Sequence, residues 1–227
     1  MDTGEFNSQR YNKPFVNYLD KFTTIRINKM MAMLQYNKQV LDVGCWDGYI
    51  MQKILDLKKA HYVFGIDNSK PSIEMCHKKK LSAKLVESVD RKLPFKNNQF
   101  DAVVAGEIIE HLYDVNTFLK EVGRILKPNG QLIITTPNLV SLGSRLTLLL
   151  GKIPWMIENE LGGKNSGHIR YFTFDVLENL LKRHNFQVVA KNVDIVHLGH
   201  RLYSSADYIT KTFPTLGRII IISAIKR

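Results

Sequence analysis

Apolar residues follow two different spacings along residues 15–138. Short, nearly continuous apolar runs, most of which end in glycine, aspartate or asparagine, are separated by segments with apolar residues three or four positions apart. The runs are typical of buried β-strands, and the segments between them are typical of amphipathic helices. The predicted strands are 38–44, 61–67, 83–88, 100–106 and 131–138, and the predicted helices are 15–34, 47–57, 72–80, 106–112 and 115–126.

Strands that alternate with helices and are apolar on both sides predict a parallel sheet with helices on both faces. The remainder of the chain differs, because residues 139–170 have no clear period. Residues 173–186 are predicted to form a helix with Thr173 as its N-cap. Two further strands, 187–195 and 218–226, are expected to pair as a C-terminal hairpin, and the four consecutive isoleucines of the second suggest a buried place in mid-sheet.

The composition indicates a globular protein. A chain of 227 residues fits one domain with a large core, and its 44% apolar and 23% charged residues are not those of a disordered chain. No apolar run approaches the roughly 20 residues that a membrane-spanning helix needs, and the first residues lack the apolar centre of a secretion signal. Cys45 and Cys76 have no disulfide-framework spacing, so a cytoplasmic location is expected.

The net charge of +11 is high. Such a charge is compatible with nucleic acid, an anionic membrane surface or an acidic substrate as a partner. The basic residues are scattered, however, and Lys78–Lys80 form the one tight run, which fits a solvated helix end equally well. Charge alone therefore selects none of these partners.

Two features mark a nucleotide site at the carboxyl ends of the predicted strands. The stretch DVGCWDG joins the first strand to a helix, where Gly44 permits a tight turn and Gly48 permits close helix packing. Asp67 ends the second strand about 20 residues later, where a carboxylate can accept hydrogen bonds from both ribose hydroxyls. Either feature alone would fit an ordinary turn or loop cap. A dinucleotide would need a glycine where this chain has Trp46.

The chain resembles the class I S-adenosylmethionine-dependent methyltransferases in a series of motifs: VLDVGCWDG, GIDNS, LPFKNNQFDAVVAGEIIEHLYD and EVGRILKPNGQLIITTPN. The resemblance covers residues 38–138, and GHIRYFT (167–173) extends it to a subgroup of small methyltransferases. It implies an α/β fold, namely a Rossmann-like, doubly wound, seven-stranded sheet with the last strand antiparallel and an inserted lid. It also implies S-adenosylmethionine as the cofactor.

The same resemblance assigns the first motif to the methionine end of the cofactor. Asp42, Gly44 and Gly48 would line this end. Trp46 departs from the glycine pattern of the family, so its indole is expected either to point outward or to form a wall of the cofactor site. Glu107, which follows the fourth strand, would face the methionine and the methyl group.

At the other end of the cofactor, the resemblance implies that Asp67 holds the ribose and that Asn68 lies beside the adenine. Asp90 lies near the position where the family contacts adenine, although its spacing to the following LPF is unusual.

A further group of candidates lies in the stretch GEIIEHL. Glu107, Glu110 and His111 are three and four residues apart, so they would share one face of a helix. His168 precedes a helix that is expected to pack back near them. Together they resemble the metal site of small-RNA 3′-terminal 2′-O-methyltransferases, and Glu-x-x-Glu-His also resembles part of the ubiquinone-pathway O-methyltransferases.

Two interpretations of this group stay open. All four residues could hold a divalent ion, and their mixed oxygen and imidazole ligands would suit Mn, Fe, Co or Zn better than Mg or Ca. Alternatively, His111 positions the substrate or acts as a base, with Glu110 and His168 beside it and no metal. Either device would help a hydroxyl acceptor to lose its proton during methyl transfer. The metal-free interpretation is preferred.

The predicted organisation is one domain in four segments. These are an N-terminal helical cap (1–37), a cofactor-binding core (38–138), an acceptor lid (139–170) and a C-terminal helix with a β-hairpin (171–227). Within the lid, Leu146–Leu150 are apolar between Arg145 and Lys152. They would suit a roof over an apolar, lipid-linked or anionic acceptor, or a helix that simply packs on the core.

The expected function is S-adenosylmethionine-dependent methyl transfer to oxygen on a small-molecule, lipid or glycan intermediate. One alternative is a metal-dependent RNA-end 2′-O-methyltransferase, with RNA as the partner. Another is a cofactor-binding protein without activity. Without a predicted membrane span, contact with a membrane would be peripheral.

Overall fold

The structure is a computed structural model that describes residues 20–158, 167–198 and 202–227. Its central strands are β1 (Asn37–Val43), β2 (Ala60–Asp67), β3 (Ser82–Leu85), β4 (Phe100–Gly106), β5 (Leu126–Pro137), β6 (Phe186–Val193) and β9 (Ile219–Lys226). Two short strands, β7 (Val196–Leu198) and β8 (Leu202–Ser204), pair separately. The helices are α2 (Lys21–Met33), α3 (Tyr49–Asp56), α4 (Lys70–Lys78), α5 (Val115–Ile125), α6 (Leu142–Leu149), α7 (Phe174–Arg183) and α8 (Asp207–Thr212), with 3-10 turns η1 (Ile109–His111) and η2 (Pro214–Leu216).

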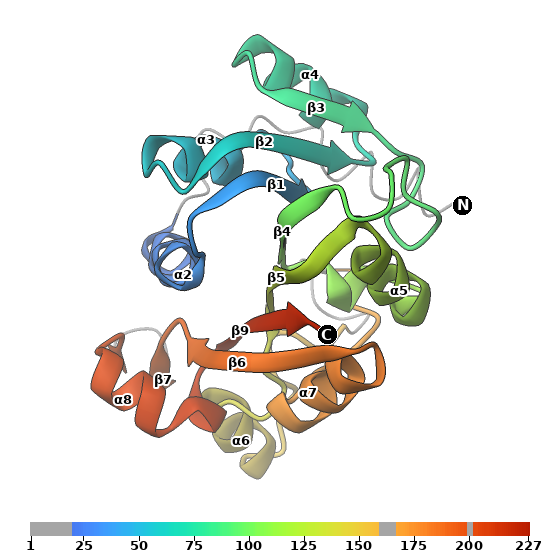
Figure 1. Ribbon diagram of the computed structural model, residues 1–227. Helices are drawn as coiled ribbons and strands as arrows, with labels where there is room; N and C mark the ends of the chain where they lie inside the picture. The colour runs from blue at the N-terminus through green and yellow to red at the C-terminus, as the bar shows by residue number, and fades with distance from the viewer. Residues whose placement is uncertain (1–19, 159–166, 199–201) are drawn as a thin grey trace.

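The seven long strands form one sheet in the order β3-β2-β1-β4-β5-β9-β6 (Figure 1). Strands β1 to β5 pair in parallel, whereas β9 runs antiparallel to both β5 and β6. The predicted fold class, a doubly wound sheet with an antiparallel last strand, is confirmed.

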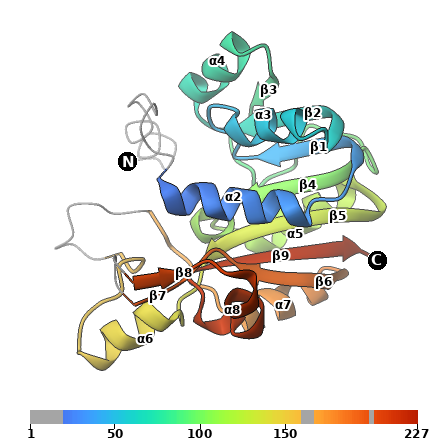
Figure 2. The same ribbon diagram turned by 90° about the vertical axis from the view of Figure 1, so that its left-hand side faces the viewer.

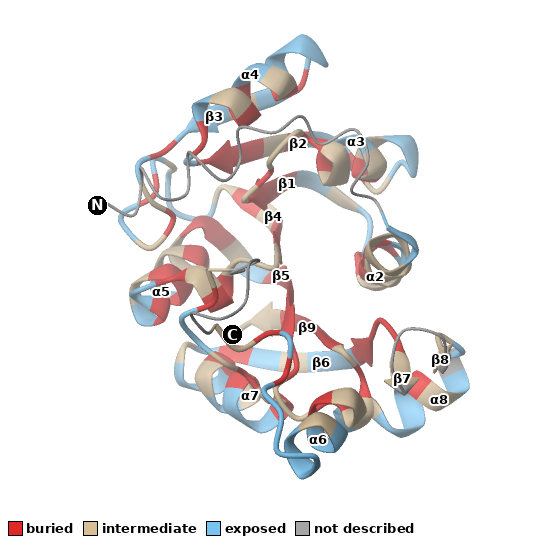
Figure 3. Cartoon of the chain, turned by 180° about the vertical axis from the view of Figure 1, so that it is seen from behind, coloured by how far each residue is buried: buried red, intermediate tan, exposed pale blue. Residues whose placement is uncertain are grey.

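Helices cover both faces of the sheet, with α2, α3 and α4 on one face and α5 and α7 on the other (Figure 1). The isoleucines of β9 pack against the helices on both faces of the sheet. Ile220 and Ile222 pack in the cluster under α5 and α7, whereas Ile221 packs in the cluster under α2 and α3. This alternation is the strand period of two, and burial on both faces accounts for the continuous apolar run (Figure 3). The mid-sheet prediction is confirmed.

Side-chain caps fix where most of the helices begin. An N-cap oxygen accepts a hydrogen bond from a backbone N–H in the first turn and replaces the partner that this N–H lacks. The capping residues are Asp20 of α2, Ser69 of α4, Asp114 of α5, Ser141 of α6 and Thr173 of α7. The predicted cap at Thr173 is therefore confirmed, with 3.3 Å between Val176 N and Thr173 Oγ1.

The C-terminal strands pair as predicted, but they do not form a simple hairpin. Strands β6 and β9 are antiparallel neighbours, while the chain between them builds β7, β8, α8 and η2 at the end of the sheet (Figure 2). This connection has no strong apolar period. The sequence pattern therefore predicted the two strands but not the elements between them.

The predicted helix at 106–112 does not form. After β4 the backbone of Glu107 takes a left-handed φ of +57°, and only the short 3-10 turn η1 follows. The N–H of Glu107 donates to the carbonyl and to the hydroxyl of Thr135, both at 3.1 Å, which holds this residue against β5. Glu107 therefore does not share a helical face with Glu110 and His111.

The N-terminal prediction is confirmed for the part of the chain that the structure describes. Residues 21–33 of the expected helix 15–34 form α2, and residues 1–19 lie outside the described ranges. The amide of Gln131 ties the end of α2 to β5, because it donates to Met33 O at 2.9 Å and accepts from Gln35 N at 3.0 Å. Among the described helices, none has the length and apolar character that crossing a bilayer requires.

Candidate active site

The candidate site lies at the carboxyl ends of β1 and β4. From β1 the chain continues outward through β2 and β3, and from β4 it continues in the other direction to β5. Ligands of open α/β sheets bind at such a reversal of strand order. Gly44, Asp67 and Glu107 each lie at a strand end on this edge.

The loop after β1 requires glycine at two positions. Gly44 has a φ of +72°, and a Cβ there would lie 2.1 Å from Cδ1 of Ile108. Gly48 has a φ of +79°, and a Cβ there would lie 2.4 Å from Cδ1 of Leu81. Both glycines therefore combine a left-handed backbone with a close approach, as the sequence predicted.

Trp46 adopts a conformation that side chains rarely take, with a φ of +45°. Its N–H donates to Asp67 Oδ2 at 2.9 Å, and its carbonyl accepts from the thiol of Cys76 at 3.0 Å. These bonds tie the loop to the end of β2 and to α4. Trp46 is half-buried, and its indole nitrogen is shielded from solvent.

Asp67 is buried but retains unused hydrogen-bonding capacity. Its two carboxylate oxygens accept one backbone N–H each, from Trp46 at 2.9 Å and from Ser69 at 2.8 Å. Burial raises the pKa of this carboxyl, and backbone hydrogen bonds from Trp46, Ser69 and Asn68 oppose that effect. Each oxygen has a second lone pair with which it can accept a ligand hydroxyl. The neighbouring Asn68 is exposed.

Asp42 is fully buried in β1, and neither of its oxygens has a hydrogen-bond partner among the described residues. Burial raises the pKa of this carboxyl well above its ordinary value, and the nearby ionisable groups of Cys76 and Asp67 raise it further. A buried carboxyl without a partner is unfavourable by roughly 1–3 kcal/mol or more, so such a group points to a ligand.

Glu107 is held by two side chains that come from different elements, α2 and β5. Its Oε1 accepts from the hydroxyl of Thr135 at 2.9 Å and lies 3.1 Å from Nη1 of Arg26 in α2. Sequence reasoning missed Arg26, because no motif surrounds it. A signal was present, since Arg26 lies beside Ile27 and four positions before Met30, both on the buried side of the helix.

Asp90 has a loop-holding role in the structure. It accepts from the N–H groups of Tyr113 and Asp114, both at 3.1 Å, and from the hydroxyl of Ser88. The carboxylate thus joins the loop after β3 to the segment after η1. Its contact with adenine stays a prediction.

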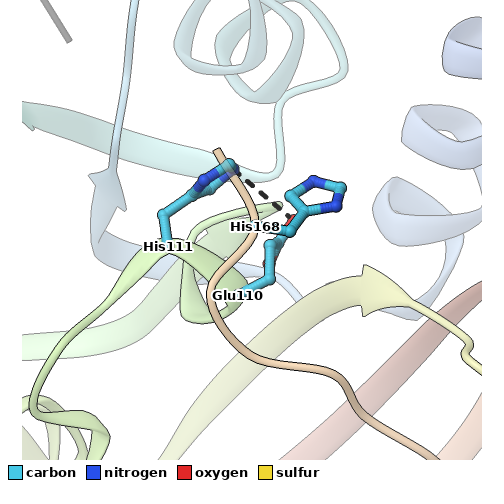
Figure 4. A group of neighbouring side chains, drawn as sticks. All are labelled: Glu110, His111 and His168. Atoms are coloured by element: carbon cyan, nitrogen blue, oxygen red, sulfur yellow. Dashed lines mark ion pairs between the residues drawn. The ribbon is translucent and has the colours of Figure 1, made fainter. Parts of the chain in front are cut away.

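The structure brings Glu110, His111 and His168 together, as the sequence predicted (Figure 4). One ligand atom from each lies within 4.8 Å of the others, and the two imidazole centroids are 5.0 Å apart. Nε2 of His111 lies 3.9 Å from Oε1 of Glu110. Glu107, the fourth ligand in the metal interpretation, lies outside this group.

Backbone hydrogen bonds hold the residues after His168 against Glu110. The N–H groups of Ile169 and Arg170 both donate to the carbonyl of Glu110, at 3.0 and 3.1 Å. The side chain of Arg170 adds a bond from Nε to the carbonyl of Leu112 at 2.8 Å. Arg170 is thus a second residue that the sequence analysis did not single out, and it anchors the GHIRYFT segment to η1.

Carbonyl groups define the protonation of both imidazoles. Nδ1 of His111 lies 2.9 Å from Gly167 O, and Nδ1 of His168 lies 3.1 Å from Met156 O. Because a carbonyl only accepts, each Nδ1 must carry the proton, and the neutral ring then has an unprotonated Nε2. Both Nε2 atoms can therefore accept a proton or bind a cation.

Glu110 is only 1% exposed. Its Oε2 accepts from the hydroxyl of Thr136 at 3.0 Å, whereas Oε1 has no hydrogen-bond partner among the described residues. Burial, and then the charge of Glu107, raise the pKa of this carboxyl well above its ordinary value. A proton or a cation at Oε1 would relieve that unfavourable burial.

Residues 41–134 match a protein family described as "Methyltransferase domain". The matched segment is similar to the class I methyltransferases that use S-adenosylmethionine, which supports that family for this chain. The matched segment contains Asp42, Asp67 and the glycine loop, and it extends through η1 to β5.

Relatives at the sequence level carry methyltransferase names. The chain is 36% identical over 105 residues to the ubiquinone biosynthesis O-methyltransferase of Pelagibacter ubique, and this match covers 45% of the chain and 43% of that protein. It is 33% identical over 123 residues to the human mitochondrial protein of the same name, covering 50% of the chain and 32% of the relative. The matches thus span less than half the length of these relatives.

Solved structures confirm the fold over nearly the whole chain. A methyltransferase from Thermotoga maritima aligns with a TM-score of 0.69 at 19% identity, covering 99% of this chain and 97% of the other. A methyltransferase from Archaeoglobus fulgidus aligns with a TM-score of 0.65 at 15% identity, covering 99% and 100%.

Proposed function

We propose that this protein transfers the methyl group of S-adenosylmethionine to a hydroxyl group of a small acceptor. The observation that carries the proposal is the cluster of Glu110, His111 and His168, in which two imidazoles, each held through Nδ1 by a backbone carbonyl, lie by a buried carboxyl at the cofactor edge of the sheet. The relatives named as ubiquinone biosynthesis O-methyltransferases support oxygen as the acceptor atom.

The residues at the carboxyl ends of β1 and β2 fit the cofactor. The ammonium group of its methionine end would supply the donors that the buried Asp42 lacks, beside the tight turn that Gly44 permits. The unused lone pairs of Asp67 would accept from the ribose hydroxyls, with the exposed Asn68 toward the adenine.

Glu107 and Trp46 would complete the proposed cofactor site. Glu107, fixed by Arg26 and Thr135, would border the methionine and methyl groups. The half-buried Trp46 would act as a wall of the cofactor site rather than point outward. Bound S-adenosylmethionine supplies an activated methyl group, so the protein's contribution is to align the acceptor and exclude water.

His111 is the preferred base. Its side chain is 26% exposed, and the bond from Nδ1 to Gly167 O fixes the ring with an unprotonated Nε2. A hydroxyl group must lose its proton as the new C–O bond forms, and Nε2 would accept it. A positioned base of this kind contributes about 10²–10⁴ in rate. His168 and Glu110 would hold the acceptor and the imidazolium that results.

A divalent metal is the second candidate, and a specific observation favours it. Oε1 of Glu110 is buried without a hydrogen-bond partner among the described residues, and one ring nitrogen of each histidine lies within 4.8 Å of a carboxylate oxygen of Glu110. Carbonyl partners on the outer nitrogens, here Gly167 O and Met156 O, are the usual support for metal-binding histidines. A cation here would supply positive charge that lowers the pKa of the acceptor hydroxyl.

Chelation separates the base from the metal. Protein purified without an affinity tag is assayed for metal content, and its activity is measured before and after chelation. Full activity in metal-free protein would establish the base. Loss of activity that Mn²⁺ or Zn²⁺ restores would establish the metal, and Glu110→Ala would then lose both metal and activity while still binding the cofactor.

The acceptor is proposed to be a lipid or glycan intermediate that carries negative charge. From Ser141 onward the chain has twelve Lys and Arg residues against six Asp and Glu residues, which favours an anionic group. A cytoplasmic setting also stays a prediction. It accords with Cys45 and Cys76, which are both free thiols.

Labelled cofactor tests the proposal and its rivals in one experiment. The protein is incubated with methyl-tritiated S-adenosylmethionine and with separate lipid, polar-metabolite and RNA extracts. We expect label in a lipid or polar metabolite and its release as iodomethane on ether cleavage with hydriodic acid. Label in RNA ends would support the RNA-end 2′-O-methyltransferase instead. Label in no extract, together with intact cofactor binding, would support a cofactor-binding protein without activity.

A further inference from the structure

Apolar side chains protrude from the second half of α6 and the turn that follows it. Leu149 is 82% exposed, Leu150 is 72% exposed and Trp155 is 55% exposed. We call this surface the α6 patch, and its members are Leu146, Leu148, Leu149, Leu150, Ile153 and Trp155. Single exposed apolar residues are ordinary on a protein surface, but a continuous group of them marks an interaction site.

The inner side of α6 is already packed, so the α6 patch is not a helix face that awaits burial in the core. Ser141 and Ser144 are buried at the start of the helix, and their hydroxyls lie 2.8 Å apart. A Cβ on Gly143 would lie 2.6 Å from the ring of His197 in β7, which shows how closely the helix meets the small sheet. The exposed leucines follow on the outer side and at the C-terminal end.

The charged side chains within the segment that carries the α6 patch have one sign. Between residues 142 and 157, Arg145 and Lys152 are the ionisable side chains; both are exposed, and the segment has no carboxylate. A helix that lies on an anionic membrane has three features. Its leucines are buried among acyl chains, its flanking cations contact lipid headgroups, and a tryptophan lies at the interface between the two.

We propose that the α6 patch docks on the surface of an anionic phospholipid bilayer. The leucines at the end of α6, with Ile153 and Trp155, enter the boundary between headgroups and acyl chains. Arg145 and Lys152 contact the phosphates. The docking does not depend on the proposed reaction.

Other occupants fit the α6 patch less well. In a pair of chains joined through this surface, Arg145 and Lys152 of one copy would face the same cations of the other, and like charges disfavour such an interface. RNA binds through cations and stacked aromatic rings, whereas the apolar members here are mostly aliphatic. A bilayer satisfies both the aliphatic side chains and the charge.

The α6 patch adjoins the candidate active site. The ring of Trp155 lies edge-on to the ring of His168, with 6.4 Å between the centroids. The next residue, Met156, holds Nδ1 of His168 through its carbonyl at 3.1 Å. A docked protein would therefore present its acceptor site to the membrane. This consequence rests on the proposed function, and it narrows the acceptor class to a lipid-linked molecule.

Vesicle sedimentation tests the docking without reference to activity. The full chain is mixed with vesicles of phosphatidylcholine alone and of phosphatidylcholine with phosphatidylglycerol. We expect binding to the anionic vesicles, weakened about tenfold or more by the double variant Leu149→Asp and Leu150→Asp. The matched control is Leu57→Asp, a change at a leucine that is 49% exposed beside α3, and it should bind like the unmodified protein.

Two further measurements sharpen the result. Trp155 fluorescence should shift to shorter wavelength on binding, and Trp155→Phe should lose that shift. Arg145→Gln with Lys152→Gln should weaken binding to anionic vesicles, as should added salt. Unchanged cofactor binding in each variant would show that it folds.

Three outcomes would overturn the proposal. The first is no binding of the unmodified protein to either vesicle, and the second is equal binding of the double aspartate variant. The third is a dimer in solution that the double variant dissociates, because it would assign the α6 patch to a second copy. Docking without methyl transfer would leave this inference intact and refute the proposed function.

Discussion

Nη1 of Arg26 lies 3.1 Å from Oε1 of Glu107. This ion pair joins α2, at the start of the described chain, to the residue that follows β4. The side chains are 13% and 26% exposed, so the pair is largely screened from water. Glu107 also accepts from Thr135 of β5, and α2 thereby takes part in shaping the cofactor edge although it lies outside the matched segment 41–134.

Arg26→Ala should weaken binding of S-adenosylmethionine. Without its cation, Glu107 becomes a partly buried carboxylate that is free to leave its position. We expect a loss of about 1–3 kcal/mol in binding free energy by isothermal calorimetry. The matched control, Arg91→Ala, removes an arginine that pairs with Glu87 at an exposed site, and it should bind the cofactor normally. Equal affinities of the two variants would refute the role of Arg26.

Asp67→Ala should disturb more interactions in the same site than Arg26→Ala does. It removes the acceptor for the ribose hydroxyls and also the partner of the Trp46 and Ser69 N–H groups. We expect the affinity for S-adenosylmethionine to fall by at least about tenfold, that is by about 1.4 kcal/mol. Asp175→Ala at the exposed start of α7 serves as the control. Stronger binding of NAD than of S-adenosylmethionine by the unmodified protein would contradict the cofactor assignment.

Asp42 gives a prediction about pH and stability. Burial raises the pKa of its carboxyl, so the folded protein keeps this proton at pH values where the unfolded chain has lost it. Between the ordinary and the raised pKa the folded state binds more protons, and the free energy of unfolding contributed by this group falls as pH rises. Asn at position 42 cannot titrate, so the Asp42→Asn variant should not show this fall in the free energy of unfolding.

Urea unfolding of cofactor-free protein measures this effect. The advantage of Asp42→Asn over the unmodified protein should be smallest near the ordinary pKa of aspartate, 3.8, and should grow as pH rises toward the raised pKa. Asp56→Asn, which removes an exposed carboxylate from α3, is the control. A difference between Asp42→Asn and the unmodified protein that stays constant with pH would show that the carboxyl is not perturbed.

The sequence predicted the parts of the fold that follow from burial. Strands buried on both faces and helices with one apolar face leave a period in the chain, and those periods located β1 to β5 as well as β6 and β9. The glycine loop was also predictable, because Gly44 and Gly48 serve backbone conformations that other residues rarely take.

What the sequence did not predict depends on contacts between distant residues. A spacing of three and four residues suggested a helix through Glu107 and His111, but hydrogen bonds to Thr135 turn the chain at Glu107 instead. Arg26 lies in no recognisable motif, and its role follows only from its ion pair with Glu107, which is distant in the sequence. The exposure of Leu149 and Leu150 was not predictable either, since a run of apolar residues looks the same in the sequence whether it packs on a core or faces solvent.

The central claim is that this protein methylates a hydroxyl group with the help of the Glu110, His111 and His168 cluster. The most direct test measures methyl transfer from labelled S-adenosylmethionine by the unmodified protein, by His111→Ala and by the control His184→Ala, each on the same acceptor extract. Calorimetry on the same preparations gives their cofactor affinities. We predict that His111→Ala lowers the transfer rate about 10²–10⁴-fold with unchanged cofactor affinity, while His184→Ala keeps both. Undiminished methyl transfer by His111→Ala would contradict the account.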